Sequence, residues 1–175
     1  MRGSFEWIEM TRRGGQVKRC HTMRTLKEQN NGEHSFGVAM LAISLCESNV
    51  KLLDHKLLAA ALMHDLHEQQ FGDTPAPVKW MNDYSNVLED AERQFDLDNH
   101  LYVELSEKQK EVLFWADKME YMFHCLEEMR LGNRDQSVLG GFDRSVGRLV
   151  NMAPPTQEAK DMLTSLQGEY NGLKK

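Results

Sequence analysis

The chain has 175 residues and a formal net charge of −6 at pH 7, and no run of lysine and arginine forms a basic stripe, so its composition disfavours binding to long DNA or RNA. A chain of this length is expected to form one domain, residues 1–175, and to bury about 70% of the surface that it exposes when unfolded. Neither a metal nor a disulfide is therefore needed for stability alone.

The pattern of cysteines and apolar residues predicts the compartment. The three cysteines are widely spaced and contain no CxxC pair, which is typical of reduced thiols in a cytoplasmic protein. No apolar run has the length of a signal-peptide core or of a membrane span. We therefore expect a soluble cytoplasmic protein that does not associate with membranes.

The first long predicted element follows a turn at residues 14–15. From Glu33 to Cys46, apolar residues cover most of the circumference of a helix. This segment is predicted to be a central and largely buried helix. His34 lies in its first turn.

The next predicted helix leads into a short breaker segment. Asp54 is a suitable N-cap, and the helix is predicted to end near His64 and Asp65. Residues 71–77 contain one glycine and two prolines, so they are predicted to form a loop.

The longest predicted helix runs from about Glu107 to Arg130. Its apolar face is formed by Val112, Ala116, Met119, Phe123 and Leu126. Asp117 lies at the edge of this face. A last helix is predicted after residues 154–155, both proline, and no segment shows sustained strand alternation. We therefore predict an all-α fold of about six or seven helices.

Four imidazole and carboxylate side chains form the most informative pattern of the chain. They are His34, then His64 and Asp65 thirty positions later, and then Asp117. Two imidazoles and two carboxylates suit a transition metal such as Co, Mn, Zn, Fe or Ni, and they leave coordination positions for water and phosphate. Each residue alone has a simpler explanation as an ordinary helix residue, so the prediction depends on the ordered set.

Two further acids follow the His-Asp pair. Glu68 is four positions after His64, so it would project from the same face if that helix continued, which would bring a carboxylate beside a metal-bound water. Taken alone, this spacing fits an ordinary intrahelical His/Glu pair better than a functional pair. Glu68 and Asp73 are the candidate catalytic acids, and either could accept or relay the proton.

The motifs resemble those of the HD-domain phosphohydrolases. They are Glu33-His34-Ser35, Met63-His64-Asp65-Leu66-His67-Glu68, Gly72-Asp73-Thr74-Pro75-Ala76-Pro77-Val78-Lys79, Ala116-Asp117-Lys118 and Cys125-Leu126-Glu127-Glu128. Within that superfamily, the chain is most similar to small bacterial 5'-deoxynucleotidases and their phage relatives that hydrolyse dATP. The resemblance covers roughly residues 17–132, and the stretch behind the HDxxE motif is its most specific part.

The resemblance implies roles for individual residues. His34, His64, Asp65 and Asp117 would bind the metal, Glu68 and Asp73 would be essential for hydrolysis, and Arg19 and Lys79 would contact phosphate. The bacterial enzymes usually have a tryptophan where this chain has Cys20, so sugar and base recognition would depend on other groups. The candidates for that recognition are Cys20, Thr22 and Pro77.

The resemblance also implies the reaction and the partners. The expected activity is hydrolysis of a deoxynucleotide at its 5'-phosphoester bond, releasing phosphate from a dNMP or triphosphate from a dNTP, with dAMP and dATP as candidate substrates. A second ion such as Mg would accompany a triphosphate substrate, and the protein would be a homo-oligomer in a bacterial or phage-infected cytosol. One alternative is a non-catalytic HD-domain protein that senses nucleotides. Another is a purely helical interaction module, which would not explain the clustered acids and imidazoles.

Overall fold

A computed structural model describes residues 2–75 and 82–174. Across these residues the fold is all-α, as predicted, with an isolated β-bridge between Lys18 and Asn30 and no strand. Residues 2–75 and 82–174 form eight helices, of which α4 is a single turn. They are α1 (Phe5–Gly14), α2 (Asn31–Leu45), α3 (His55–Met63), α4 (Glu68–Phe71), α6 (Asn82–Asp98), α7 (Glu107–Arg130), α8 (Gln136–Val150) and α9 (Gln157–Leu173).

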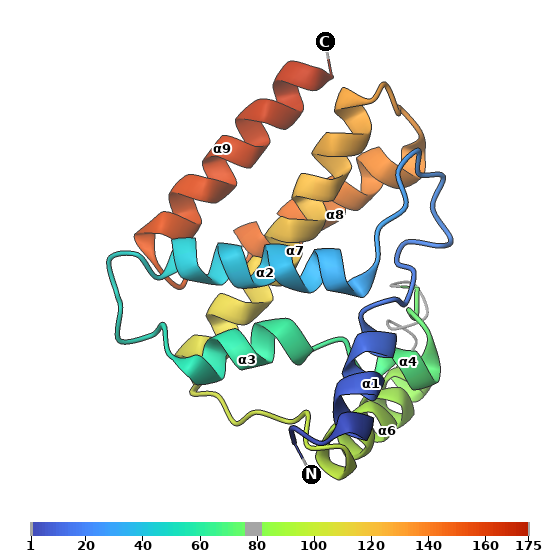
Figure 1. Ribbon diagram of the computed structural model, residues 1–175. Coiled ribbons are helices and arrows are strands. Elements are labelled where there is room, and N and C mark those ends of the chain that lie inside the picture. The colour runs from blue at the N-terminus through green and yellow to red at the C-terminus, as the bar shows by residue number, and fades with distance from the viewer. Residues whose placement is uncertain (1, 76–81, 175) are drawn as a thin grey trace.

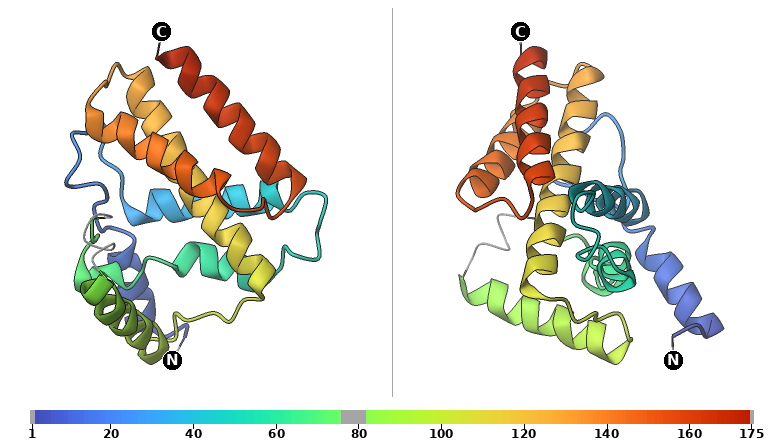
Figure 2. Two further views of the ribbon diagram at one scale, coloured as in Figure 1. Left: turned by 180° about the vertical axis from the view of Figure 1, so that it is seen from behind. Right: turned by 90° about the vertical axis from the view of Figure 1, so that its left-hand side faces the viewer.

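The long helix α7 is the centre of the molecule. Helix α2 crosses α7, and α3 lies beside α2 (Figure 1). The side view in Figure 2 shows α8 on one side of α7 and α2 with α3 on the other. Helices α1, α4 and α6 gather at the end of the molecule near the N-terminus.

One large apolar core joins α2, α3, α7, α8 and α9. Trp115 and Phe142 are its largest fully buried side chains. The rings of Phe142 and Tyr170 stack with their centroids 3.9 Å apart, which fixes α9 against α8. This core lies beside the N-terminal end of α2 and the C-terminal end of α3, where His34, His64 and Asp65 are found.

A second, smaller apolar cluster attaches α1 and α6 to the end of α3. It contains Met63, Leu66 and Leu101 as buried residues. His67 adds a polar link, because its ring nitrogens lie 3.6 Å from Glu92 Oε1 and 3.4 Å from Asp96 Oδ2 of α6. The turn that follows α3 is therefore fixed by apolar contacts and by the contacts of His67 with α6.

Most predicted helix boundaries are confirmed. Helix α7 begins and ends at the predicted residues, and Ser106 and Gln109 form a capping box at its start. Asp54 caps α3 by accepting a hydrogen bond from the backbone N–H of Leu57. Helix α9 begins after the two prolines, with Thr156 as its N-cap. Among the described helices, none is both long enough and apolar enough to cross a membrane.

The structure corrects the predicted burial of α2 and shows that α3 does not continue to Glu68. Helix α2 is not largely buried all round, because Phe36 is 64% exposed and Met40 is 50% exposed on a face that none of the described helices covers. Helix α3 ends at Met63, so His64 and Glu68 do not share one helix. Residues 64–67 form turns, and Glu68 instead begins α4.

Candidate metal centre

The predicted metal ligands come together where α2 and the end of α3 meet α7. The Nε2 atoms of His34 and His64 are 3.2 Å apart, and Asp65 Oδ2 lies 3.6 Å and 3.2 Å from them. From α7, Asp117 Oδ1 lies 3.2 Å from His34 Nε2. Two nitrogens bound to one tetrahedral ion at ~2.1 Å would be ~3.4 Å apart. The spacing of the two imidazoles therefore fits a shared divalent ion, and His34, His64 and Asp65 each offer one ligand atom within 4.8 Å of the others.

Both imidazoles are oriented by hydrogen bonds at their other nitrogen. His64 Nδ1 donates to the carbonyl oxygen of Ala61 at 2.9 Å. His34 Nδ1 is hydrogen-bonded to the buried carboxylate of Glu120, whose other oxygen accepts a 2.8 Å bond from the Gln29 amide. Both Nε2 atoms are thereby directed to the same point, as in sites where a carboxylate or carbonyl fixes a metal-bound histidine.

Glu120 was not identified from the sequence as a functional residue. It lies one turn after Asp117 on α7, so it reaches the same site. Gly37 makes room for it, because a Cβ at position 37 would lie 2.7 Å from Glu120 Cγ. A helical glycine one turn after His34 was the only signal in the sequence.

Charges around the site keep the two carboxylate ligands ionised. Burial would raise the pKa of Asp65 and Asp117, but neighbouring side chains lower both pKa values: His64 and Arg19 at Asp65, and Lys118 and His34 at Asp117. Burial and Arg19 would lower the pKa of His34, but its carboxylate partners Asp117 and Glu120 raise it to about 9. A metal must displace that proton, so metal binding and proton release are coupled.

Glu68 is the buried acid of the site. Its carboxylate is 2% exposed and accepts a 2.9 Å bond from Asn31 Nδ2, which also donates to the carbonyl oxygen of Asp65 at 3.0 Å. Burial and the Asp65 carboxylate raise the pKa of Glu68 to about 7, against the opposing effects of Arg19 and Asn31. Asn31, one turn before His34, was also missed from the sequence.

Arg19 connects the N-terminal loop to the ligand set. Its Nη1 lies 2.5 Å from Asp65 Oδ2 and 3.3 Å from Asn31 Oδ1. Burial would lower the pKa of Arg19, but the surrounding carboxylates, chiefly those of Asp65 and Glu68, raise it. The guanidinium is thus a fixed positive charge at the edge of the predicted metal position.

Asp73 holds the same loop from the other side. Its Oδ2 accepts a 2.8 Å bond from the backbone N–H of Cys20, which has a left-handed conformation with φ of 56°. Burial raises the pKa of Cys20 to about 11, so the thiol is protonated at neutral pH. Asp73 therefore positions the chain around Arg19, besides lying in the pocket as predicted.

The pocket in front of the ligands contains most of the predicted substrate-binding residues. Arg19, Cys20 and Thr22 line it together with Glu68 and Asp73. Pro77 and Lys79 lie outside the described residues. The opposite wall was not predicted and comes from α7 and α8, with Lys118, Tyr121, Gly141, Arg144, Ser145 and Arg148.

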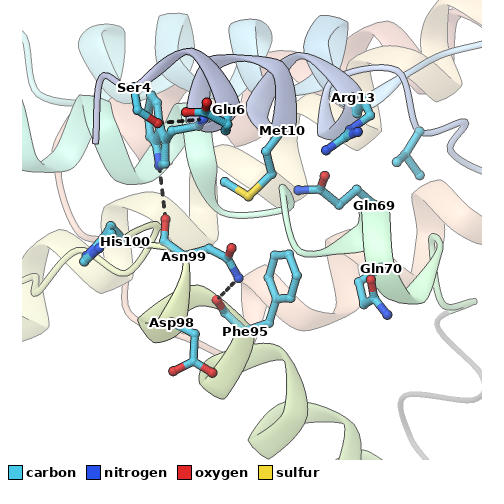
Figure 3. A pocket seen from close by; sticks show the side chains of 12 residues that line it. Ser4, Glu6, Met10, Arg13, Gln69, Gln70, Phe95, Asp98, Asn99 and His100 are labelled. Atoms are coloured by element: carbon cyan, nitrogen blue, oxygen red, sulfur yellow. Dashed lines mark hydrogen bonds between the residues drawn. The ribbon is translucent and has the colours of Figure 1, made fainter. Parts of the chain in front are cut away.

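A larger and more open cleft lies between α1, α4 and α6. Figure 3 shows Arg13, Gln69, Phe95 and His100 around it. Its volume is about 630 Å³, but none of the potential metal ligands found among the described residues lines it, whereas Asp65 and Asp117 line the other pocket. Size alone therefore does not identify the reactive site.

Comparison with known proteins gives 5'-deoxynucleotidases that are similar in sequence and solved structures that are similar in fold. A 5'-deoxynucleotidase of Yersinia pestis (strain Pestoides F) is 29% identical over 143 residues, which cover 68% of this chain and 71% of the relative. The fold is similar to that of the cyanophage S-2L HD phosphohydrolase DatZ, solved with dA and one catalytic Zn²⁺, with a TM-score of 0.69, 19% identity and 95% of each chain covered. The PH0347 protein of Pyrococcus horikoshii OT3 has a TM-score of 0.73 at 21% identity, with 95% of this chain and 99% of that chain covered.

The predicted resemblance to HD-domain phosphohydrolases is confirmed by these relatives. A family model described as 5'-deoxynucleotidase YfbR-like matches residues 6–139, which is well over half of the chain. The chain therefore belongs to the YfbR-like 5'-deoxynucleotidase family.

Proposed function

We propose that this protein is a metal-dependent phosphohydrolase that cleaves the 5'-phosphoester bond of a deoxynucleotide, and that all 175 residues act as one HD domain. The observation that carries the proposal is the convergence of His34, His64, Asp65 and Asp117 beside the buried acid Glu68. Family membership supports the reaction class. A helical interaction module would have no need of such a set.

The donor set suits one divalent transition metal, for which Zn, Co, Mn, Fe and Ni are the candidates. Such an ion, when bound, lowers the pKa of a coordinated water and polarises a phosphoryl oxygen. Zn²⁺ has support from DatZ, whose structure contains one catalytic Zn²⁺. A triphosphate substrate would carry a second ion, such as Mg²⁺, on its own phosphate oxygens.

The side chains of the pocket supply binding and proton transfer. Arg19 offsets charge on the phosphate bound at the ligands. Glu68, with a pKa near neutrality, can accept a proton from the attacking water and release it to the leaving O5'. Asp73 keeps the loop of Arg19 and Cys20 against the substrate, and Thr22 and Cys20 border the sugar and base. Pro77 and Lys79 complete the proposal as predicted base and phosphate contacts.

A substrate panel tests this function. The purified protein is stripped of metal, reloaded with each candidate ion, and assayed with dAMP, dATP, AMP, ATP and an aryl phosphate. We expect turnover that depends on the metal and strongly favours the deoxy forms. His64→Ala and Asp65→Ala should lose both stoichiometric metal and turnover. Full metal occupancy in these variants would refute the ligand assignment, and a wild-type protein that binds deoxynucleotides without hydrolysing them would be a sensor.

We also propose that the protein is a homo-oligomer in the cytosol. Phe36, Met40 and Ile43 are spaced by four and three residues, so they form one exposed apolar stripe on α2. A stripe of this kind is typical of a surface that another subunit covers. Light scattering of the wild type and of Met40→Glu should give a larger mass for the wild type. Equal monomeric masses would contradict the proposal.

A further inference from the structure

Helix α8 presents one polar face to the candidate metal centre. Gly141, Arg144, Ser145 and Arg148 follow one another at intervals of three, one and three residues, so they share a face of the helix. All four line the pocket that also contains Asp65, Glu68 and Asp117. Helix α8 therefore forms a wall of the site.

Two adjacent glycines in the middle of α8 shape this wall. A glycine within a helix costs about 1 kcal/mol relative to alanine, so a pair is unusual without a local reason. A Cβ at Gly141 would lie 2.2 Å from the hydroxyl oxygen of Tyr121, and a Cβ at Gly140 would lie 3.1 Å from Arg144 Nη1. The glycines thus let Tyr121 sit against α8 and let the Arg144 guanidinium fold back along the helix.

The cations of the pocket differ in how they are paired. Arg19 is paired with Asp65, and Lys118 Nζ lies 2.6 Å from Asp117 Oδ2. Within the described residues, by contrast, no carboxylate pairs with Arg144, and both Arg144 and Arg148 are exposed at the mouth of the pocket. Arg144 and Arg148 thus place positive charge beside the carboxylates of the candidate metal centre, in a chain whose net charge is −6.

We propose that Arg144 and Arg148 bind the β- and γ-phosphates of a deoxynucleoside triphosphate whose α-phosphate lies at the metal ligands. This inference rests on the proposed function and specifies its substrate class. A guanidinium is a planar fork of donors that matches phosphate oxygens, and a polyphosphate bound at the ligands extends beyond its α-phosphate within the pocket that Arg144 and Arg148 line. A monophosphate has no group that would extend to this wall.

The corresponding reaction is balanced with water as the only co-substrate. The water oxygen bonds to the α-phosphorus, the bond from that phosphorus to O5' breaks, and O5' takes up a proton. The products are a deoxynucleoside and inorganic triphosphate. Arg144 and Arg148 would hold the triphosphate part in the substrate and in the product.

Kinetics with matched substrates tests the assignment. For the metal-loaded protein, kcat/KM is measured with dATP and dAMP for the wild type, Arg144→Gln, Arg148→Gln and the double variant. Arg13→Gln is the control, because Arg13 is an exposed arginine that lines the other cleft (Figure 3). We expect each α8 variant to lose about tenfold in kcat/KM for dATP, since hydrogen bonds to charged groups are worth this much or more. The value for dAMP should change less than about twofold, which is a change of under 0.5 kcal/mol.

A binding measurement makes the test independent of turnover. Calorimetry with inorganic tripolyphosphate should give a dissociation constant about tenfold weaker for Arg144→Gln than for the wild type and for Arg13→Gln. Equal binding by all three proteins, or equal losses with dATP and dAMP, would overturn the α8 site and leave the proposed hydrolase in place. A wild-type protein that binds tripolyphosphate but hydrolyses neither nucleotide would instead overturn the proposed function. Circular dichroism of each variant confirms that the fold is retained.

Discussion

Glu120 joins the candidate metal centre to the interior of the helix bundle. It is buried, it is hydrogen-bonded to His34 Nδ1, and it is itself held by Gln29. We predict that Glu120→Gln weakens metal binding by about ten- to a hundredfold, because a partner of this kind fixes the ring and raises its basicity. Competition with a metal chelator measures the affinity.

The control for Glu120 is on the same helix. Glu127 lies seven residues later and is exposed, where it pairs with Lys27 at 3.1 Å. Glu127→Gln should bind metal like the wild type. If Glu120→Gln does the same, the hydrogen bond to His34 has no role in metal affinity.

Glu68 and Asp73 differ in their surroundings, and we expect this difference to appear in their variants. Glu68→Ala should keep the metal and lose about a hundred- to ten-thousandfold in kcat, as is typical of a positioned acid or base. Asp73→Asn should also keep the metal and lose turnover, but Asp73 bonds to the Cys20 N–H. Its loss should therefore include a higher KM for the substrate. Metal content and steady-state kinetics are measured together, and a near-normal rate in either variant would exclude a chemical role for that acid.

At the scale of elements, Glu128 fastens the loop that carries Arg19 to the end of α7. Its buried carboxylate accepts bonds from the backbone N–H groups of Leu26 and Lys27 at 2.6 and 2.7 Å, and from Asn133 Nδ2 at 2.6 Å. Burial would raise the pKa of Glu128, but these donors lower it. A carboxylate with a lowered pKa stabilises the fold above its unfolded pKa of about 4.3, and that contribution is lost as the pH falls through the folded value.

We therefore predict that Glu128→Gln lowers the free energy of unfolding by about 2 kcal/mol at pH 7. The difference between wild type and variant should shrink as the pH falls below the unfolded pKa of about 4.3 towards the lower folded pKa, because the unfolded chain then binds a proton that the folded carboxylate does not. Urea denaturation at pH 7 and pH 3.5 measures both values. Glu127→Gln, which affects an exposed ion pair, should cost under about 0.5 kcal/mol at either pH. A pH-independent difference for Glu128→Gln would contradict the charge-based explanation.

The sequence predicts an element well when the signals are local. Helix α7 was predicted to the residue because its apolar periodicity runs through the segment Glu107–Arg130. The burial of α2 was overestimated because periodicity cannot tell which face lacks a neighbouring helix, so exposure at Phe36 depends on tertiary packing. The end of α3 was predicted to within one or two residues, but residues 64–67 contain no glycine or proline, so the sequence left open whether the helix continues to Glu68.

The same distinction applies to the site. The metal ligands could be predicted because they occur as a motif of chemically distinctive residues. Glu120, Asn31 and Arg144 could not, since their roles depend on which helices cross and on spaces left by glycines such as Gly37. Contacts across helices are set by packing, and no spacing along the chain encodes them.

At the scale of the whole molecule, the candidate metal centre joins segments that are far apart in the chain. His34 is on α2, His64 and Asp65 follow α3, and Asp117 is in the middle of α7. An ion held by these groups binds the folded state and not the separated segments. Metal binding should therefore stabilise the complete fold.

We predict that removing the metal lowers Tm by about 5–10 °C. A ligand at a hundred times its Kd contributes about 2.7 kcal/mol, and each kcal/mol shifts Tm by about 2–4 °C in a domain of this size. Calorimetric scans of the metal-loaded and chelator-treated protein measure the shift. His64→Ala is the control: it removes a ligand that is only partly buried, so the variant should fold and its Tm should not respond to metal or chelator. A Tm that rises equally with metal in the wild type and in His64→Ala would mean that the stabilising ion binds elsewhere, whereas a response confined to the wild type would link the fold of three distant segments to this one site.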